Sequence, residues 1–346
     1  MFLLPVFFVL NKYYLYLLIN QALSEGHKKT LTKNNGIVRN TMDFDILIDQ
    51  SLSSFVTGGG PSQISNNSLL SIINDFEDGS WRYQKFHRFI WDNILQTALS
   101  NQEREALIDG PFTSLALASK NLRLTDSDQD ISKGSELAEI FLYGIMRHHF
   151  KALPVVPKIF YKQNSQDNAK GADSVHVVIV DNNNFSLWFG EAKFYNSIED
   201  GRFDTIITSV KNSITTEKLR KENSIILNTQ DLYELVQDEK LKLKISNTLS
   251  SNNSMDNIKP LLNIPIFILH ECPITENSNS LSDSYKSSII ELHKERAQAF
   301  FKKHQEKIKD IYDYDKIKFH LILFPVPKKE IIIDKFVGTV RYHKEQ

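Results

Sequence analysis

The chain has 346 residues, enough for about two domains, and its 41% hydrophobic and 24% charged residues are typical of a globular protein. A formal net charge of −1 excludes a global basic field, so a nucleic-acid site must be a local patch or lie on a partner. The single cysteine, Cys272, excludes a disulfide framework and a cysteine-based zinc site, and it suits a reducing cytoplasm.

The first 41 residues form an extension that admits several interpretations. Its apolar run, Phe2 to Ile19, has the length of a membrane span. Lys12, in the middle of this run, would be costly at the centre of a bilayer, and the positively charged start of a signal peptide is missing. A membrane anchor, a buried helix and an upstream extension of the reading frame before Met42 all stay open. We expect a cytoplasmic protein without stable membrane association, unless residues 2–19 are an anchor.

Residues 42–128 are predicted to form a mainly helical N-terminal domain. Within it, the segment from Trp81 to Leu95 interleaves aromatic side chains with basic ones. This pattern is compatible with a nucleic-acid face, but its apolar residues recur at helical spacing, which favours a core stripe with a solvated basic side. The polar residues 125–135 then indicate a domain boundary.

Residues 129–346 mix helical and strand-like patterns, which predicts an α/β domain with a central mixed sheet flanked by helices. Its first helix, at residues 134–150, is apolar nearly all round and should be sandwiched between other layers. Glu139 falls within an apolar stripe of this helix, so its carboxylate needs a cation, a hydrogen-bond donor or a metal. Glu136 lies in the first turn, where a negative charge complements the helix dipole.

A predicted hairpin follows, with strands at residues 175–180 and 185–193. Glu191 and Lys193 are two residues apart in the second strand, so they point to the same face. Asp173 comes two residues before the first strand. The hairpin therefore gathers two acids and a lysine at the end of the strands that is remote from the turn.

The register of the hairpin decides whether Asp173 shares a face with Glu191. If residues 181–184 form the loop, Asp173 pairs with Ala192 and points away from Glu191. A shared site requires a loop with an odd number of residues, or a bulge, and Gly190 is a natural position for one.

If these side chains converge, they form a reagent set for phosphodiester hydrolysis. The carboxylates of Asp173 and Glu191, with the backbone carbonyl of Ala192, suit a hard cation such as Mg²⁺ or Mn²⁺. Such an ion activates a water and shields phosphate charge, while Lys193 positions the attacking water or stabilises the developing charge. Glu139 would enter from the helix as a third carboxylate.

The order of these residues resembles the core of the PD-(D/E)xK nucleases, with a helix glutamate, an aspartate and then Glu-Ala-Lys after a hairpin. More narrowly, SELAEIFLYGI (135–145), GADSVHVVIV (171–180) and WFGEAKFY (188–195) resemble the HamA family of the Hachiman anti-phage defence systems. The resemblance extends over most of the chain from about Met42. It implies a restriction-endonuclease-like core that follows the helical N-terminal domain. Ala172 departs from the pattern, because the motif's name has proline there.

The resemblance also implies an activity. Proteins of this kind are expected to be bacterial, cytoplasmic, Mg²⁺-dependent deoxyribonucleases, held by a partner helicase, HamB, and released on phage DNA. Carried over by position, Glu139, Asp173 and Glu191 would be metal ligands, with Glu136 as a substitute for Glu139. Lys193 would be the catalytic lysine, and Ala192 would contribute its backbone carbonyl.

A function of another class stays open beside the nuclease. The chain could be a non-catalytic subunit that binds DNA or a helicase through a nuclease-like scaffold. The helix expected at residues 293–312 is rich in lysine and arginine. A solvated face is the default interpretation of such a helix, and a surface for the DNA backbone or the helicase is the alternative.

Overall fold

The computed structural model describes residues 42–51, 66–123, 135–161, 171–181 and 184–346. The predicted N-terminal extension, residues 1–41, lies outside these ranges, and so does nearly all of the predicted boundary at residues 125–135. Within the described ranges, no helix combines the length and apolar character that a membrane crossing requires.

Most of the strands belong to one sheet. The described strands are β1 (Asp45–Ser51), β2 (Asn67–Ile73), β3 (Phe76–Glu77), β4 (Ser80–Trp81), β5 (Leu153–Val156), β6 (Ser174–Asp181), β7 (Asn184–Tyr195), β8 (Leu262–Glu271) and β9 (Lys318–Val326). Seven of them form the central sheet in the order β1-β2-β9-β8-β7-β6-β5, and β3 pairs with β4. Strands β2, β9, β8 and β7 are parallel neighbours, whereas β1, β6 and β5 pair in antiparallel fashion. The predicted central mixed sheet is confirmed.

Helices connect and cover these strands. They are α2 (Tyr83–Ala98), α3 (Asn101–Ala106), α4 (Pro111–Lys120), α5 (Ser135–His148), α6 (Lys158–Tyr161), α7 (Asp200–Ser213), α8 (Thr216–Asn228), α9 (Gln230–Leu235), α10 (Glu239–Leu249), α11 (Pro273–Glu276), α12 (Asp283–Ile308) and α13 (Lys329–Lys344). Short 3₁₀ helices are η2 (Met255–Asn257), η3 (Lys259–Leu261) and η4 (Tyr314–Lys316).

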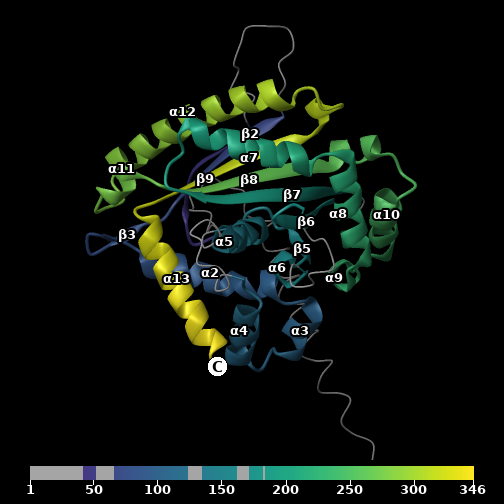
Figure 1. Ribbon diagram of the computed structural model, residues 1–346, viewed down its shortest axis with the longest axis horizontal. Coiled ribbons are helices and arrows are strands. Elements are labelled where there is room, and N and C mark those ends of the chain that lie inside the picture. Colours follow the sequence, from purple (N-terminus) through teal and green to yellow (C-terminus); the bar gives the residue numbers. More distant parts are fainter. Residues whose placement is uncertain (1–41, 52–65, 124–134, 162–170, 182–183) are drawn as a thin grey trace, which may run out of the picture. The chain divides into compact units, whose positions relative to one another are not determined.

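The sheet separates two helical layers. In Figure 1, α7 and α12 lie above the strands and α2, α5 and α13 lie below them. We call these sides of the sheet the α7 face and the α5 face. Side chains alternate along β7, so Leu187 and Phe189 pack on the α7 face, whereas Trp188 and Ala192 pack on the α5 face.

The α5 face holds an aromatic core. Residues 136–146 of α5 are all buried, which confirms the prediction of a sandwiched helix. Phe141 of this helix packs against phenylalanines from several elements, with ring centroids 4.8–5.5 Å away: Phe44, Phe86, Phe89, Phe267 and Phe324. This interdigitation fixes α5 against the centre of the sheet.

Residues 42–128, predicted to be mainly helical, contain helices α2, α3 and α4 but also strands β1 to β4. Strands β1 and β2 lie in this range and belong to the central sheet. Leu69–Ile73 are buried on both faces of β2, as expected for a strand with neighbours on both edges and layers on both sides. The two predicted domains therefore share one sheet, and Asn40–Gln346 form one compact unit.

Helix α2 contains the aromatic and basic segment, and the structure supports its interpretation as a core stripe. Phe86, Ile90 and Ile94 are fully buried. Of the basic side chains, Arg82 and Lys85 form ion pairs with Asp75, at 3.0 and 3.1 Å, and Arg88 is exposed.

The basic residues of α12 are partly neutralised within the chain. Lys303 and Lys307 contact the carboxylate of Asp204 on α7, at 3.3 and 2.6 Å. Arg296 contacts Asp200 of the same helix α7 at 3.2 Å. Helices α7 and α12 thus meet through ion pairs at the surface of the α7 face, as expected for a solvated helix face.

Candidate active site

The hairpin of β6 and β7 has the register that a shared site requires. From Ser174–Gly190 to Ile179–Phe185 the strands pair regularly, but Asp181 pairs with Asn184. Val180 is therefore the extra residue of a bulge next to the turn. Continued by one residue, the register sets Asp173 opposite Glu191, and the Asp173 N–H donates to the Gly190 carbonyl at 2.8 Å.

The bulge predicted at Gly190 is wrong in position. Gly190 forms a regular pair with Ser174, and its lack of a side chain serves packing instead. A Cβ atom there would lie 2.2 Å from Ser174 Oγ, 2.8 Å from Leu142 Cδ2 and 3.1 Å from Pro265 Cγ. Only glycine lets α5 approach the sheet this closely at the strand position before Glu191.

The carboxylates and the lysine of the hairpin come together on the α7 face. Lys193 Nζ lies 2.6 Å from Glu191 Oε1 and 3.5 Å from Asp173 Oδ2. It also donates to the carbonyl of Ala192 at 3.1 Å. Asp173 Oδ2 in turn accepts the backbone N–H of Ala192 at 3.0 Å. We call Asp173, Glu191, Lys193 and the Ala192 carbonyl the carboxylate–lysine cluster.

The end of β6 explains why this cluster forms here. Strand β6 begins at Ser174, whereas β7 continues to Tyr195 and pairs there with β8 on its other edge. The Ala192 N–H therefore has no β6 partner, and the Asp173 side chain accepts its hydrogen bond. An aspartate that satisfies the backbone at a strand end is held in place by that bond.

The cluster is partly buried and strongly charged. The side chains of Glu191, Asp173 and Lys193 are 6%, 17% and 26% exposed. Burial and the charge of Asp173 raise the pKa of Glu191, against the opposing effect of Lys193. Burial lowers the pKa of Lys193, but Asp173 and Glu191 outweigh it and raise that pKa above its usual range. Lys193 is therefore an ammonium donor at neutral pH and not a base.

Helix α7 supplies a residue that the sequence did not indicate. The Ser209 hydroxyl donates to Glu191 Oε1 at 2.6 Å, so this oxygen accepts from both Ser209 and Lys193. Ser209 lies among the buried apolar residues of α7, and a serine in an amphipathic helix carries no signal of such a role. Only the packing of α7 on the sheet brings it to the cluster.

Two further candidate ligands, Glu136 and Glu139, belong to α5, the helix that covers the α5 face. Glu139 is buried, at 3% exposure, in the helix that covers the α5 face, whereas Glu191 and Lys193 point to the α7 face. Glu136 is also buried, and both its oxygens accept the Arg123 N–H at 3.1 Å. In the part of the chain that the structure describes, no group of three His, Cys, Asp or Glu side chains is arranged to hold a metal ion. The role of Glu139 as a third ligand stays a prediction.

The cluster nevertheless has the donor chemistry of a cation site. The Lys193 ammonium makes contacts with one oxygen each from Asp173, Glu191 and the Ala192 backbone. These are the oxygens predicted for a metal, and carboxylate and carbonyl oxygens are the ligands that Mg²⁺ accepts while it keeps several waters. The oxygens of Asp173, Glu191 and Ala192 that surround the Lys193 ammonium therefore have the chemistry that a hard divalent ion requires.

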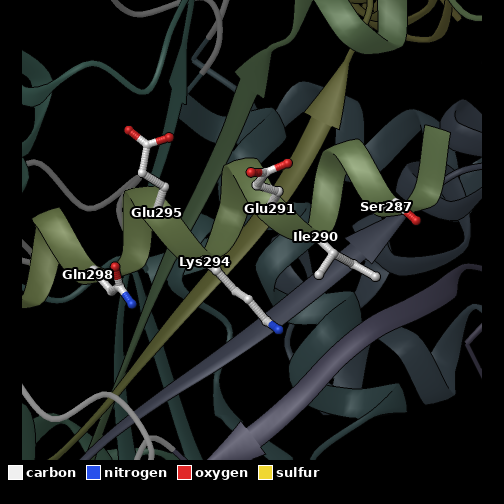
Figure 2. A pocket seen from close by; sticks show the side chains of 6 residues that line it. All are labelled: Ser287, Ile290, Glu291, Lys294, Glu295 and Gln298. Atoms are coloured by element: carbon white, nitrogen blue, oxygen red, sulfur yellow. The ribbon is translucent and has the colours of Figure 1, made fainter. Parts of the chain in front are cut away.

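Two hollows on the surface lie away from this cluster. One, of about 440 Å³, runs along α12 and is lined by residues of that helix alone (Figure 2). In Figure 2 the carboxylates of Glu291 and Glu295 lie on one side of the helix and the Lys294 ammonium on the other, so these charged groups do not converge. The other hollow, of about 480 Å³, lies among α8, α9, α10 and η2. Neither hollow contains a residue of the carboxylate–lysine cluster.

Comparison with known proteins identifies the family of the chain. No curated protein matches the sequence. The sequence profile of the HamA family matches residues 47–339, which include the whole cluster and all of the central sheet except the first two residues of β1. The match covers most of the chain, and the chain therefore belongs to the HamA family.

Proposed function

We propose that this protein is a Mg²⁺-dependent deoxyribonuclease of the PD-(D/E)xK type and the effector subunit of a Hachiman-type anti-phage defence complex. The observation that carries the proposal is the convergence of Asp173, Glu191, Lys193 and the Ala192 carbonyl at the end of the hairpin. Membership of the HamA family supports the defence context.

The residues of the cluster have distinct roles in this proposal. Asp173, Glu191 and the Ala192 carbonyl would hold Mg²⁺ or Mn²⁺, with Glu139, or Glu136 in its place, as a further carboxylate. When bound, the ion supplies Lewis-acid chemistry that activates water and shields phosphate charge. Ser209 orients the Glu191 carboxylate through its hydrogen bond.

Lys193 acts as a donor in the hydrolysis. Its side chain reaches Asp173, Glu191 and the Ala192 carbonyl, so its ammonium lies where it can donate hydrogen bonds to a phosphate oxygen or to the attacking water. Preorganised donors of this kind typically contribute about 100-fold to 1,000-fold to the rate of the chemical step.

The charge distribution supports a role for a partner. The net charge is −1, and basic side chains of α2 and α12 form ion pairs within the chain. DNA that binds to such a protein gains little from a general basic field. We therefore propose that a helicase of the HamB type presents the DNA to this subunit in the bacterial cytoplasm.

Plasmid nicking tests the proposal. The full chain with its partner helicase should nick supercoiled DNA with Mg²⁺ or Mn²⁺, and Lys193→Ala and Asp173→Ala should lower the rate by about 100-fold or more. Lys240→Ala, at an exposed lysine on α10, is the matched control and should retain the rate. Equal rates for the parent protein, Lys193→Ala and Asp173→Ala would refute the nuclease.

A second function is favoured by one observation. Glu139 belongs to the helix on the opposite face of the sheet, and only Asp173 and Glu191 supply carboxylates to the cluster in the described ranges. A non-catalytic subunit that binds DNA or the helicase through the same scaffold would have this feature. Such a subunit would bind DNA or helicase in an anisotropy assay but would not nick the plasmid with either metal.

A further inference from the structure

A buried ion pair lies beside the candidate site. Lys158 Nζ contacts both carboxylate oxygens of Glu222, at 2.7 and 3.0 Å, and thereby joins α6 to α8. The two side chains are only 1% and 2% exposed. Buried ion pairs often stabilise a protein no more than apolar residues of similar volume would, so the presence of this pair calls for a role beyond stability.

Glu222 also holds the backbone that leads to Asp173. Its Oε1 accepts the N–H of Ala172 at 2.9 Å. A Cβ atom on Gly171 would lie 1.7 Å from the same oxygen, so only glycine allows this approach. The carboxylate is thus packed directly against the peptide that precedes Asp173.

The segment from Gly171 to Asp173 is fixed at both ends. Glu222 binds the Ala172 N–H at one end, and the Asp173 N–H donates to the Gly190 carbonyl at the other. Between these bonds the chain has little freedom to rotate. The direction of the Asp173 side chain toward the Ala192 N–H follows from this double attachment.

We propose that Glu222 is a positioning residue for Asp173 and that Lys158 is the counter-charge that keeps Glu222 in place. A buried carboxylate without a counter-charge would be costly, so Glu222 can accept the Ala172 N–H here only because Lys158 neutralises its charge. The proposal rests on the role of Asp173 as a metal ligand. Partners that orient a metal ligand typically change metal affinity by about 10-fold to 100-fold when they are removed.

Metal binding to the full chain is the first test. In calorimetric titrations with Mn²⁺, Glu222→Gln and Lys158→Met should bind the ion about 10-fold to 100-fold more weakly than the parent protein. Leu219→Ala, at a fully buried position of α8 one turn before Glu222, is the control that loosens the helix while it keeps the Glu222 carboxylate and both of its partners. It should unfold at a lower temperature and keep the parent affinity for Mn²⁺.

Gly171→Ala provides a second variant that keeps the charges of the pair. Its Cβ forces the Glu222 carboxylate away from the Ala172 N–H, so it should weaken Mn²⁺ binding in the same way. Parent-like affinity in both Gly171→Ala and Glu222→Gln would overturn the positioning role.

Hydrogen exchange separates this inference from the proposed function. In Glu222→Gln the amides of Ala172 and Ala192 should exchange faster than in the parent protein, while those in the Leu219→Ala control should not change relative to their neighbours. If the parent protein binds no Mn²⁺ and nicks no DNA, the nuclease proposal fails and the exchange rates still decide the positioning role. Unchanged exchange at both amides in Glu222→Gln would refute the positioning role whether or not the protein is a nuclease.

Discussion

The two faces of the central sheet differ in what they bury. The α5 face is packed with phenylalanine rings around Phe141, and α5 also buries Glu136 and Glu139, whereas the α7 face consists mainly of aliphatic side chains with linked polar groups set among them. The carboxylate–lysine cluster belongs to the α7 face, and so does a buried chain of Ser71, His293 and His270. The same strands thus present an aromatic surface on one side and the carboxylate–lysine cluster on the other.

The hairpin contributes side chains to both faces of the sheet. Because side chains alternate along β7, Ala192 packs on the aromatic face while its neighbours Glu191 and Lys193 reach the opposite side. The aromatic face packs against the sheet through apolar contacts, and the cluster forms on the opposite side. On the α7 face, the free-energy cost of burying the charges of the cluster is offset by hydrogen bonds from each charged group to a partner.

The largest effect on stability is expected from the centre of the aromatic face. Phe141→Ala removes a ring that touches five other phenylalanines and should lower the free energy of unfolding by about 3–5 kcal/mol. Urea unfolding monitored by circular dichroism measures this loss. Phe203→Ala on α7 is the comparison, since Phe203 contacts one ring, Phe300, at 5.3 Å. An equal or larger loss for Phe203→Ala would contradict the contrast between the faces.

The pH dependence of stability reports on the buried histidines of the α7 face. Burial lowers the pKa of His270 from 6.5 to about 4. Between these values the unfolded chain binds a proton that the folded protein does not, so the stability present above pH 6.5 is lost as the pH falls toward 4. His270 should contribute about 1.4 kcal/mol per pH unit in this window.

Urea unfolding at several pH values checks this slope. His270→Gln removes the titrating ring, so its stability should depend on pH less steeply than that of the parent protein. The absolute stability of the variant does not enter this comparison, because only the slope between pH 4 and 6.5 is used. Identical slopes for the two proteins would show that His270 is not buried in its neutral form.

Gly190→Ala tests how closely the aromatic face approaches the hairpin. The added Cβ would contact Ser174, Leu142 and Pro265 at 2.2–3.1 Å, and overpacking of this kind costs about 1–3 kcal/mol. The unfolding midpoint in urea measures the loss. Gly201→Ala in α7 is the matched control, because a Cβ there meets no atom within 4 Å. The close packing would be disproved if both variants were equally stable.

The smallest effect is expected from the ion pairs between α7 and α12. Asp204→Asn removes the carboxylate that Lys303 and Lys307 share, but this carboxylate is 47% exposed. Solvent screening limits its contribution, so the free energy of unfolding should fall less than in any of the variants above. The loss should shrink further in high salt. A large loss of stability that does not depend on salt would contradict the assignment of these ion pairs to the solvent-exposed surface.

Local patterns in the sequence were sufficient to predict several elements. The all-round apolar pattern predicted a sandwiched α5, and the alternation of Glu191 and Lys193 placed both on one face of β7. The helical spacing of Phe86, Ile90 and Ile94 predicted the buried stripe of α2. These patterns depend only on the spacing of residues within one helix or strand. They therefore hold in any fold that buries the apolar side of that element.

Only the tertiary structure decided the relations between elements. Strand β2 has a short apolar pattern that does not distinguish a helix from a buried strand, and its pairing with β9 settled the matter. The bulge at Val180 sets the register that aligns Asp173 with Glu191. The Ser209 hydroxyl and the Glu222 carboxylate reach the site from other elements, through hydrogen bonds to Glu191 and to the Ala172 N–H. The sequence thus determined which residues are candidates for the site, whereas register and layer packing decided that Asp173 joins Glu191 and that the helix of Glu139 covers the α5 face. The physical reason is that alternation along a strand is a local property, but the face that a strand turns toward a given helix depends on the whole fold.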